Sequence, residues 1–213
     1  PAYTPGVIDE AMRQLNTGRP RPVEIEMAMD LMGDSAEVTL PTPPESYEKP
    51  PVDADLLEEA AKILGKAKNP LIVVGSGALD ASDEVLAVAE ALQAPVLSKR
   101  SGKGIISAKH YLHANSPMGH ALWAKADAVL AVGSRIKEQL MMWGKDDDMK
   151  VIRIEVDPVE MTRIHNPDVA ILGDAALSLS TLQPLLEKHN SKRESREEEM
   201  LALREKVYGE IRA

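Results

Sequence analysis

A Gly-Ser-Gly turn after a short apolar segment is the feature of this sequence best suited to bind a ligand. Leu71 to Val74 is typical of a strand, Gly75-Ser76-Gly77 follows it, and a helix is expected over 82–92. In this arrangement, backbone N–H groups and a helix N-terminus can hold a phosphate or pyrophosphate. A full dinucleotide fingerprint would place a third glycine at Asp80, whose charge would repel a phosphate. Alternatively, the glycines only permit a tight turn.

Polar residues also follow the other expected strands, at the edge where open α/β sheets bind ligands. They are Ser98-Lys99-Arg100, Gly133-Ser134-Arg135, Glu155-Val156-Asp157 and Gly173-Asp174-Ala175. Arg100 and Arg135 could clamp phosphates, and Glu155 or Asp157 could accept hydrogen bonds from ribose hydroxyls. The alternative is that these are surface charges without a ligand.

The spacings place no set of catalytic groups together. We find no Ser-His-Asp order, no carboxylate pair and no P-loop, and the chain has no Cys. His110 and His113 lie three residues apart, but no third ligand is near, so we expect no metal site. The sequence therefore predicts a cradle for a nucleotide and no catalytic residue.

The elements that would position these residues alternate between helices and strands. Helices are expected over 55–66, 82–92, 118–125 and 175–189, and strands over 70–74, 94–98, 128–132, 151–156 and 169–172. Continuous apolar strands are buried on both faces, which is typical of a parallel sheet. The pattern predicts a doubly wound α/β fold with helices on both faces of the sheet.

The flanking segments differ from this central region. Residues 42–54 are Pro-rich and indicate a linker. Residues 1–41 carry a helix over 4–16 and a short strand over 21–27, which together cannot bury a core, so we interpret them as the remnant of another domain. An extension packed on the main domain is the alternative. Residues 189–213 are rich in both charge signs, which favours a solvated helix or a second linker.

Composition narrows the classes of partner. The chain has 4 Tyr, 2 Trp and no Phe, which leaves little for stacking on nucleic-acid bases. Its net charge of -9 disfavours binding to nucleic acid or to an anionic membrane. No apolar run approaches the roughly 20 residues that span a bilayer. The absence of Cys agrees with a cytoplasmic protein.

Five segments, in one order, resemble the middle of thiamine-diphosphate-dependent enzymes of the acetolactate synthase, benzoylformate decarboxylase and oxalyl-CoA decarboxylase superfamily. They are residues 18–23 (GRPRPV), 69–77 (NPLIVVGSG), 126–135 (ADAVLAVGSR), 151–158 (VIRIEVDP) and 171–175 (ILGDA). The resemblance implies a six-stranded parallel sheet. It assigns residues 1–41 to the end of a pyrimidine-binding domain, 55–188 to the middle domain, and 189–213 to a linker toward a pyrophosphate domain.

The resemblance also implies a reaction and partners for a longer parent protein. The parent would cleave or form a carbon–carbon bond next to the carbonyl of a 2-keto acid, and would be a homo-oligomer. The glutamate that activates thiamine would precede Pro1, and the GDG motif for metal and diphosphate would follow Ala213. Thiamine diphosphate and magnesium would therefore bind the parent, and this chain would be inactive alone, with the catalytic domains of the same parent as its partners.

Members of this superfamily bind FAD, ADP or no ligand in the middle domain. Carried over by position, the contacts with FAD or ADP would fall on Gly75, Ser76, Gly77, Lys99, Arg100, Met118, Gly133, Ser134, Arg135, Glu155, Val156, Asp174 and Ala175. Where flavin-binding members read GARFDDR, residues 133–139 read GSRIKEQ. A purely structural middle domain without a ligand and a stand-alone flavoprotein-like domain are the alternatives.

Overall fold

The computed structural model describes residues 1–47, 49 and 51–212 of the chain. The chain divides into two units, Pro1–Pro50 and Pro51–Ala213. The second unit holds the sheet and all the candidate site residues, and the described part of the first consists of one helix, one 3-10 turn and extended chain.

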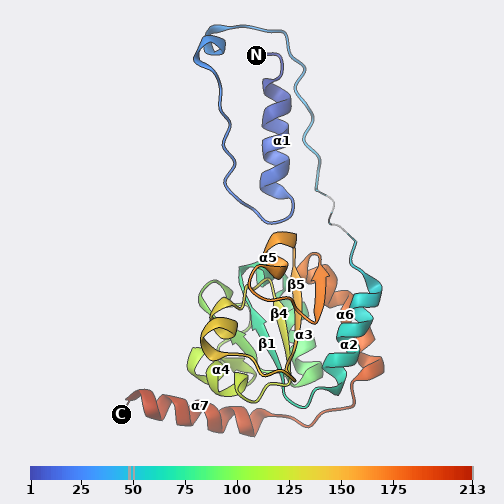
Figure 1. The fold of residues 1–213 in the computed structure, drawn as a ribbon, viewed down its shortest axis with the longest axis vertical. Coiled ribbons are helices and arrows are strands. Elements are labelled where there is room, and N and C mark those ends of the chain that lie inside the picture. The colour runs from blue at the N-terminus through green and yellow to red at the C-terminus, as the bar shows by residue number, and fades with distance from the viewer. Residues whose placement is uncertain (48, 50, 213) are drawn as a thin grey trace. The chain divides into compact units, whose positions relative to one another are not determined.

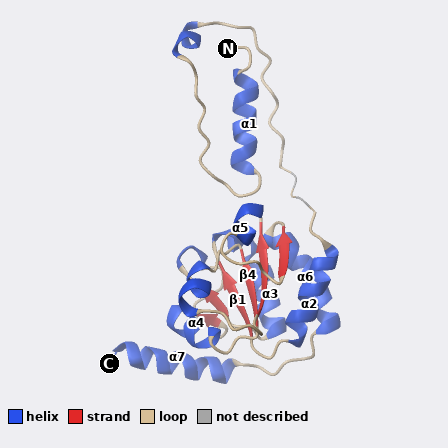
Figure 2. Ribbon diagram, viewed as in Figure 1, coloured by secondary structure: helices blue, strands red, loops and turns tan. Residues whose placement is uncertain are grey.

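The second unit is built on a six-stranded sheet with the order β3-β2-β1-β4-β5-β6, and every pair of strands is parallel (Figure 2). The strands are β1 (Pro70–Val74), β2 (Val96–Ser98), β3 (His113–Ala114), β4 (Ala128–Val132), β5 (Lys150–Glu155) and β6 (Val169–Leu172). The strand order reverses between β1 and β4, so this is the position at which a doubly wound sheet offers a crevice to a ligand. The predicted fold class is confirmed.

Helices cover both faces because side chains alternate along the strands. Ile72 and Val74 of β1 pack on one face against α2 (Ala54–Lys66), α3 (Ser82–Leu92) and α6 (Ala175–His189). Leu71 and Val73 pack on the other face with residues of α4 (Ser116–Trp123) and α7 (Glu197–Arg212). Figure 1 shows α2 and α6 side by side on their face of the sheet. Helices therefore cover both faces of the sheet, as the apolar strands predicted.

Five short turns complete the described elements, and most lie at the ends of strands. They are η1 (Met29–Gly33), η2 (Ser76–Ala81) after β1, η3 (Arg100–Gly102) after β2, the π-helical turn η4 (Gln139–Trp143) after β4, and α5 (Pro158–Thr162) after β5. The strands β1, β4 and β6 and the helices α3 and α6 have the predicted bounds.

Four predicted elements differ from the structure by one or two residues at their ends, and α2 is one of them, because it begins at Ala54 instead of Asp55. Strand β2 begins at Val96 instead of Ala94, after Pro95, which has no N–H to donate. Helix α4 begins at Ser116 instead of Met118, because the Asn115 side chain accepts a hydrogen bond from the Met118 N–H at 3.1 Å and so caps the helix, and it ends at Trp123 instead of Lys125. Strand β5 spans 150–155 instead of 151–156. The two-residue strand β3 was missed.

The first unit contains α1 (Thr4–Asn16), as predicted, but the predicted strand over 21–27 is wrong. A strand needs a partner for its backbone hydrogen bonds, and none of the described residues offers one here. Of the residues of α1 only Ala11 is buried, while Val7, Ile8 and Met12 are about half exposed. The described part of this unit therefore has no core of its own.

The charged C-terminal segment forms the expected helix, α7, but solvent does not surround it. Met200 and Val207 are buried in the hydrophobic cluster that also contains residues of α4 and of the sheet. The Arg193 guanidinium donates hydrogen bonds to three carbonyl oxygens at the end of α2, including that of Ala67 at 2.8 Å and that of Leu64 at 3.0 Å. The prediction of a fully solvated helix missed two buried positions seven residues apart, which lie on one face of the helix. No helix in the described part of the chain is long and apolar enough to cross a membrane.

We predict that Arg193→Ala lowers the free energy of unfolding of the second unit by about 2 kcal/mol, because it leaves carbonyl groups at the end of α2 without donors. Arg196→Ala is the matched control, since Arg196 pairs with the exposed Glu199 and should cost less than about 1 kcal/mol. Urea unfolding followed by tryptophan fluorescence measures both, because Trp123 and Trp143 lie in this unit. Equal stability of the two variants would contradict the prediction.

Candidate functional site

The loops that follow β1 and β4 touch each other at the carboxyl end of the sheet. The Gly75 N–H donates to the Val132 carbonyl at 3.1 Å, and the Gly77 N–H donates to the Gly133 carbonyl at 3.2 Å. A Cβ atom on Gly75 would lie 2.3 Å from the Gly133 oxygen, so only glycine fits. Gly133 itself has a φ of +53°. These glycines therefore serve a close backbone contact, and the Gly77 N–H is already bonded within the protein.

Two basic groups at this edge of the sheet are paired with carboxylates. The Lys99 ammonium forms an ion pair with Glu138, which joins the end of β2 to the loop after β4. Partial burial and the neighbouring Arg100 lower the pKa of Lys99. The Arg135 Nε lies 3.2 Å from a carboxylate oxygen of Glu160. Arg135, one of the two arginines that the sequence suggested as phosphate clamps, and Lys99, a contact that the resemblance implied, therefore have anionic partners in the fold.

The acidic groups at the strand ends hold nearby backbone. Glu155 is 7% exposed, and its Oε1 accepts hydrogen bonds from the Val156 N–H at 3.0 Å and the Asp157 N–H at 3.4 Å. Asp157 caps α5 by accepting from the Val159 N–H at 2.9 Å. Asp174 caps α6 in the same way. A role for Glu155 or Asp157 in binding a ribose would compete with these bonds.

Arg153 connects several segments at this edge, and it was not identified as a candidate from the sequence. It is 1% exposed, and its guanidinium donates to the Glu160 carbonyl at 2.9 Å, the Met161 carbonyl at 2.6 Å and the Ser134 carbonyl at 3.3 Å. Burial lowers the pKa of Arg153, and the neighbouring carboxylates oppose that shift. A charged residue inside the apolar strand 151–154 was the signal that could have identified it. Arg153 ties the loop after β4 to the end of α5.

The remaining predicted contacts are not gathered around one free space. Met118 and Ala175 are buried in the two hydrophobic clusters, one on each face of the sheet. The Ser134 hydroxyl accepts from the Ile136 N–H at 3.3 Å, and Val156 is half-buried. Within the described residues, the side chains of Ser76 and Arg100 are exposed and make no hydrogen bond or ion pair. The structure thus brings the predicted residues to one edge and leaves two of their side chains unengaged.

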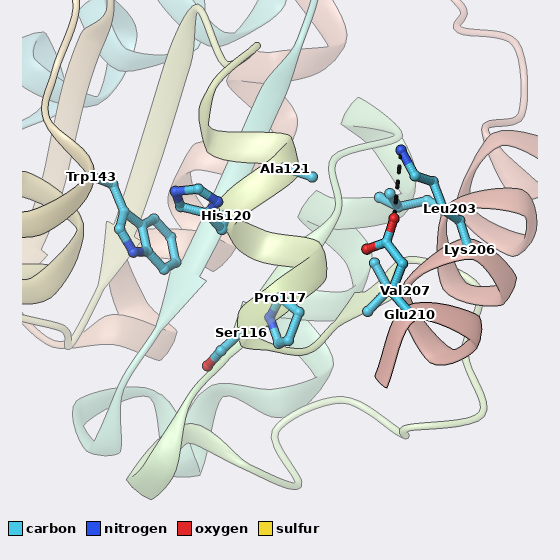
Figure 3. Close-up of a pocket in the computed structure, with 9 residues that line it drawn as sticks. All are labelled: Ser116, Pro117, His120, Ala121, Trp143, Leu203, Lys206, Val207 and Glu210. Carbon is cyan, nitrogen blue, oxygen red and sulfur yellow. Dashed lines mark ion pairs between the residues drawn. The ribbon is translucent and has the colours of Figure 1, made fainter. Parts of the chain in front are cut away.

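An open groove of ≈480 Å³ lies elsewhere, between α4, η4 and α7 (Figure 3). Its lining consists of Ser116, Pro117, His120, Ala121, Trp143, Leu203, Lys206, Val207 and Glu210. His120 meets Trp143 edge to face at 5.2 Å between ring centroids. None of the candidate strand-end residues lines this groove. The described residues also contain no group of three or more His, Asp or Glu side chains that could hold a metal ion.

We predict that Gly133→Ala destabilises the second unit by roughly 1–3 kcal/mol more than Gly144→Ala. Both glycines have a positive φ, +53° and +81°, so both variants pay about 1–2 kcal/mol for the left-handed backbone. Only the new Cβ at Gly133 would press on the backbone of Gly77, at 2.4 Å, while the one at Gly144 meets nothing within 4 Å. Thermal unfolding of the two variants makes the comparison, and equal losses would show that the loops do not touch.

Comparison with known proteins agrees with this fold. Residues 57–182 match the family model described as "Thiamine pyrophosphate enzyme, central domain". The chain is also similar to a solved structure from Mycobacterium smegmatis assigned as a thiamin diphosphate-dependent enzyme. In that comparison the TM-score is 0.68 and the identity 20%, over 90% of this chain and 39% of the other.

Curated relatives share the same region. The acetolactate synthase large subunit of Corynebacterium glutamicum is 30% identical over 85% of this chain and 31% of its own length. A protein of Pseudomonas aeruginosa assigned as a 2-ketoarginine decarboxylase is 30% identical over 85% of this chain and 34% of its own length. The 2-hydroxyacyl-CoA lyase 1 of Dictyostelium discoideum is 30% identical over 86% of this chain and 34% of its own length. This chain spans about a third of the length of these relatives, and it belongs to the thiamine pyrophosphate enzyme family, whose central domain it contains.

Proposed function

We propose that this chain is a non-catalytic middle domain that holds the catalytic domains of its parent enzyme in register. The observation that carries the proposal is the state of the polar groups at the carboxyl edge of the sheet. Gly77, Lys99, Arg135, Glu155 and Asp174 all make hydrogen bonds or ion pairs within the fold. A site built for a tightly held nucleotide needs donors and acceptors that the ligand itself satisfies. Here the protein satisfies most of them.

The parent would form or cleave a carbon–carbon bond next to the carbonyl of a 2-keto acid. The names of the relatives describe a synthase, a decarboxylase and a lyase, which agree with this class. Thiamine diphosphate would supply the carbanion-stabilising chemistry. Thiamine diphosphate and magnesium would bind to other parts of the parent.

The same proposal extends to the parts of the chain. Residues 1–41 would complete a preceding catalytic domain, which would cover the half-exposed apolar side chains of α1. Residues 42–54 would be the linker, 55–188 the middle domain, and 189–213 the connection to the next domain. The parent would be a cytoplasmic homo-oligomer without affinity for nucleic acid, in keeping with the net charge of -9.

A second candidate is a middle domain that binds FAD or ADP at the carboxyl ends of β1 and β2. The observation in its favour is that Ser76 and Arg100, which follow these two strands, are exposed and make no hydrogen bond or ion pair within the described residues. A hydroxyl and a guanidinium are groups that bind phosphate. The stand-alone flavoprotein alternative has less support, because the chain matches only about a third of the length of its relatives.

The test is the activity of the full-length parent enzyme, purified and freed of cofactors. We expect turnover of a 2-keto acid that requires thiamine diphosphate and magnesium together, and a rate that neither FAD nor ADP changes. The reason is that the middle domain would hold domains in place without contributing a ligand to the reaction. Activity that depends on FAD or ADP would favour the second candidate, and no thiamine-dependent turnover of any 2-keto acid would overturn the proposed reaction class.

A further inference from the structure

One ion pair crosses the carboxyl end of β1. Lys99 follows β2 and Glu138 follows β4, and the strand order places β1 between them. The Lys99 side chain is 22% exposed and the Glu138 side chain 42% exposed. The pair therefore joins the two loops on either side of the Gly75-Ser76-Gly77 turn, which is where the sequence pattern suggested a phosphate.

A second carboxylate is fixed beside Arg135. The Glu160 side chain is 4% exposed, although the Arg135 side chain is 51% exposed. Arg163 donates to the other carboxylate oxygen of Glu160 at 2.7 Å. The buried Arg153 binds the Glu160 carbonyl oxygen, so α5 is anchored independently of the Glu160 side chain. The carboxylate therefore occupies a set position against Arg135.

A carboxylate and a phosphate present the same chemistry to Lys and Arg, since both are anions whose oxygens accept charge-assisted hydrogen bonds. We propose that Glu138 and Glu160 are internal substitutes for the phosphates of a diphosphate-bearing ligand, and that they keep Lys99 and Arg135 closed to such ligands. This inference rests on the proposed role as a middle domain without a tightly held nucleotide. The exposed Arg100, next to Lys99, is available as a third cation once the glutamates are neutral.

The test compares binding of inorganic diphosphate and ADP to the 213-residue chain and to the Glu138→Gln, Glu160→Gln double variant. Titration calorimetry should show at least about a tenfold gain in affinity for both probes in the double variant, because two cations lose their internal partners. The matched control is Glu199→Gln. It removes one negative charge, as each single glutamine substitution does and half as many as the double variant, and it frees Arg196, which lies just before α7 and pairs with Glu199 at 2.6 Å.

Each outcome decides for or against the inference. No gain in the double variant, or an equal gain in Glu199→Gln, overturns it, because the effect would be absent or would be one of net charge. Adding Arg135→Ala to the double variant should remove most of the gain, and a gain that persists also overturns the inference. If the double variant does not fold, Glu138→Gln alone should still bind diphosphate more tightly than the control does.

This experiment is separate from the test of the proposed function. FAD-dependent activity of the parent would contradict the scaffold role and would leave the comparison of glutamine variants unchanged. Thiamine-dependent activity without FAD, combined with no gain in the double variant, would leave the scaffold role intact and remove the inference about the glutamates.

Discussion

The contact between the loops after β1 and β4 is the constraint on which the carboxyl edge of this domain depends. In this sheet the strand order reverses between the two central strands, β1 and β4: β2 and β3 are added on one side of β1, and β4, β5 and β6 on the other. Their loops can approach only because Gly75, Gly77 and Gly133 lack side chains. The Gly77 N–H then bonds to the Gly133 carbonyl, so this N–H is already engaged within the protein.

The polar residues around this contact are arranged consistently with it. Arg153 is fully buried inside β5 and needs acceptors, which it finds on the loop after β4 and at the end of α5. Its bonds hold α5 so that Glu160 meets Arg135. Many polar groups at this edge therefore have partners within the fold, although the buried Ser98 hydroxyl and the Arg153 Nε have no hydrogen-bond partner among the described residues.

The local pattern of apolar and turn residues in the sequence predicted much of this architecture. The strands Pro70–Val74, Ala128–Val132 and Val169–Leu172 have the expected bounds because buried parallel strands are continuous apolar runs between turn residues. The strand expected over 21–27 is absent because a strand depends on a partner that the local sequence does not specify. The burial of Met200 and Val207 was missed because charged residues surround them in the sequence. Partners of residues far apart in the chain, such as Lys99 and Glu138 or Arg153 and Ser134, could not be predicted from spacing alone.

The most direct measurement of this account is the amide hydrogen exchange of Gly77, followed residue by residue by NMR. The account predicts protection comparable with that of the Gly75 amide, which bonds to the Val132 carbonyl in the core of the sheet, because the Gly77 N–H is held by the Gly133 carbonyl. Exchange of Gly77 at the rate of an unprotected amide, with Gly75 still protected, would contradict the account. It would show that the loop after β1 is open and that its N–H groups are available to a phosphate.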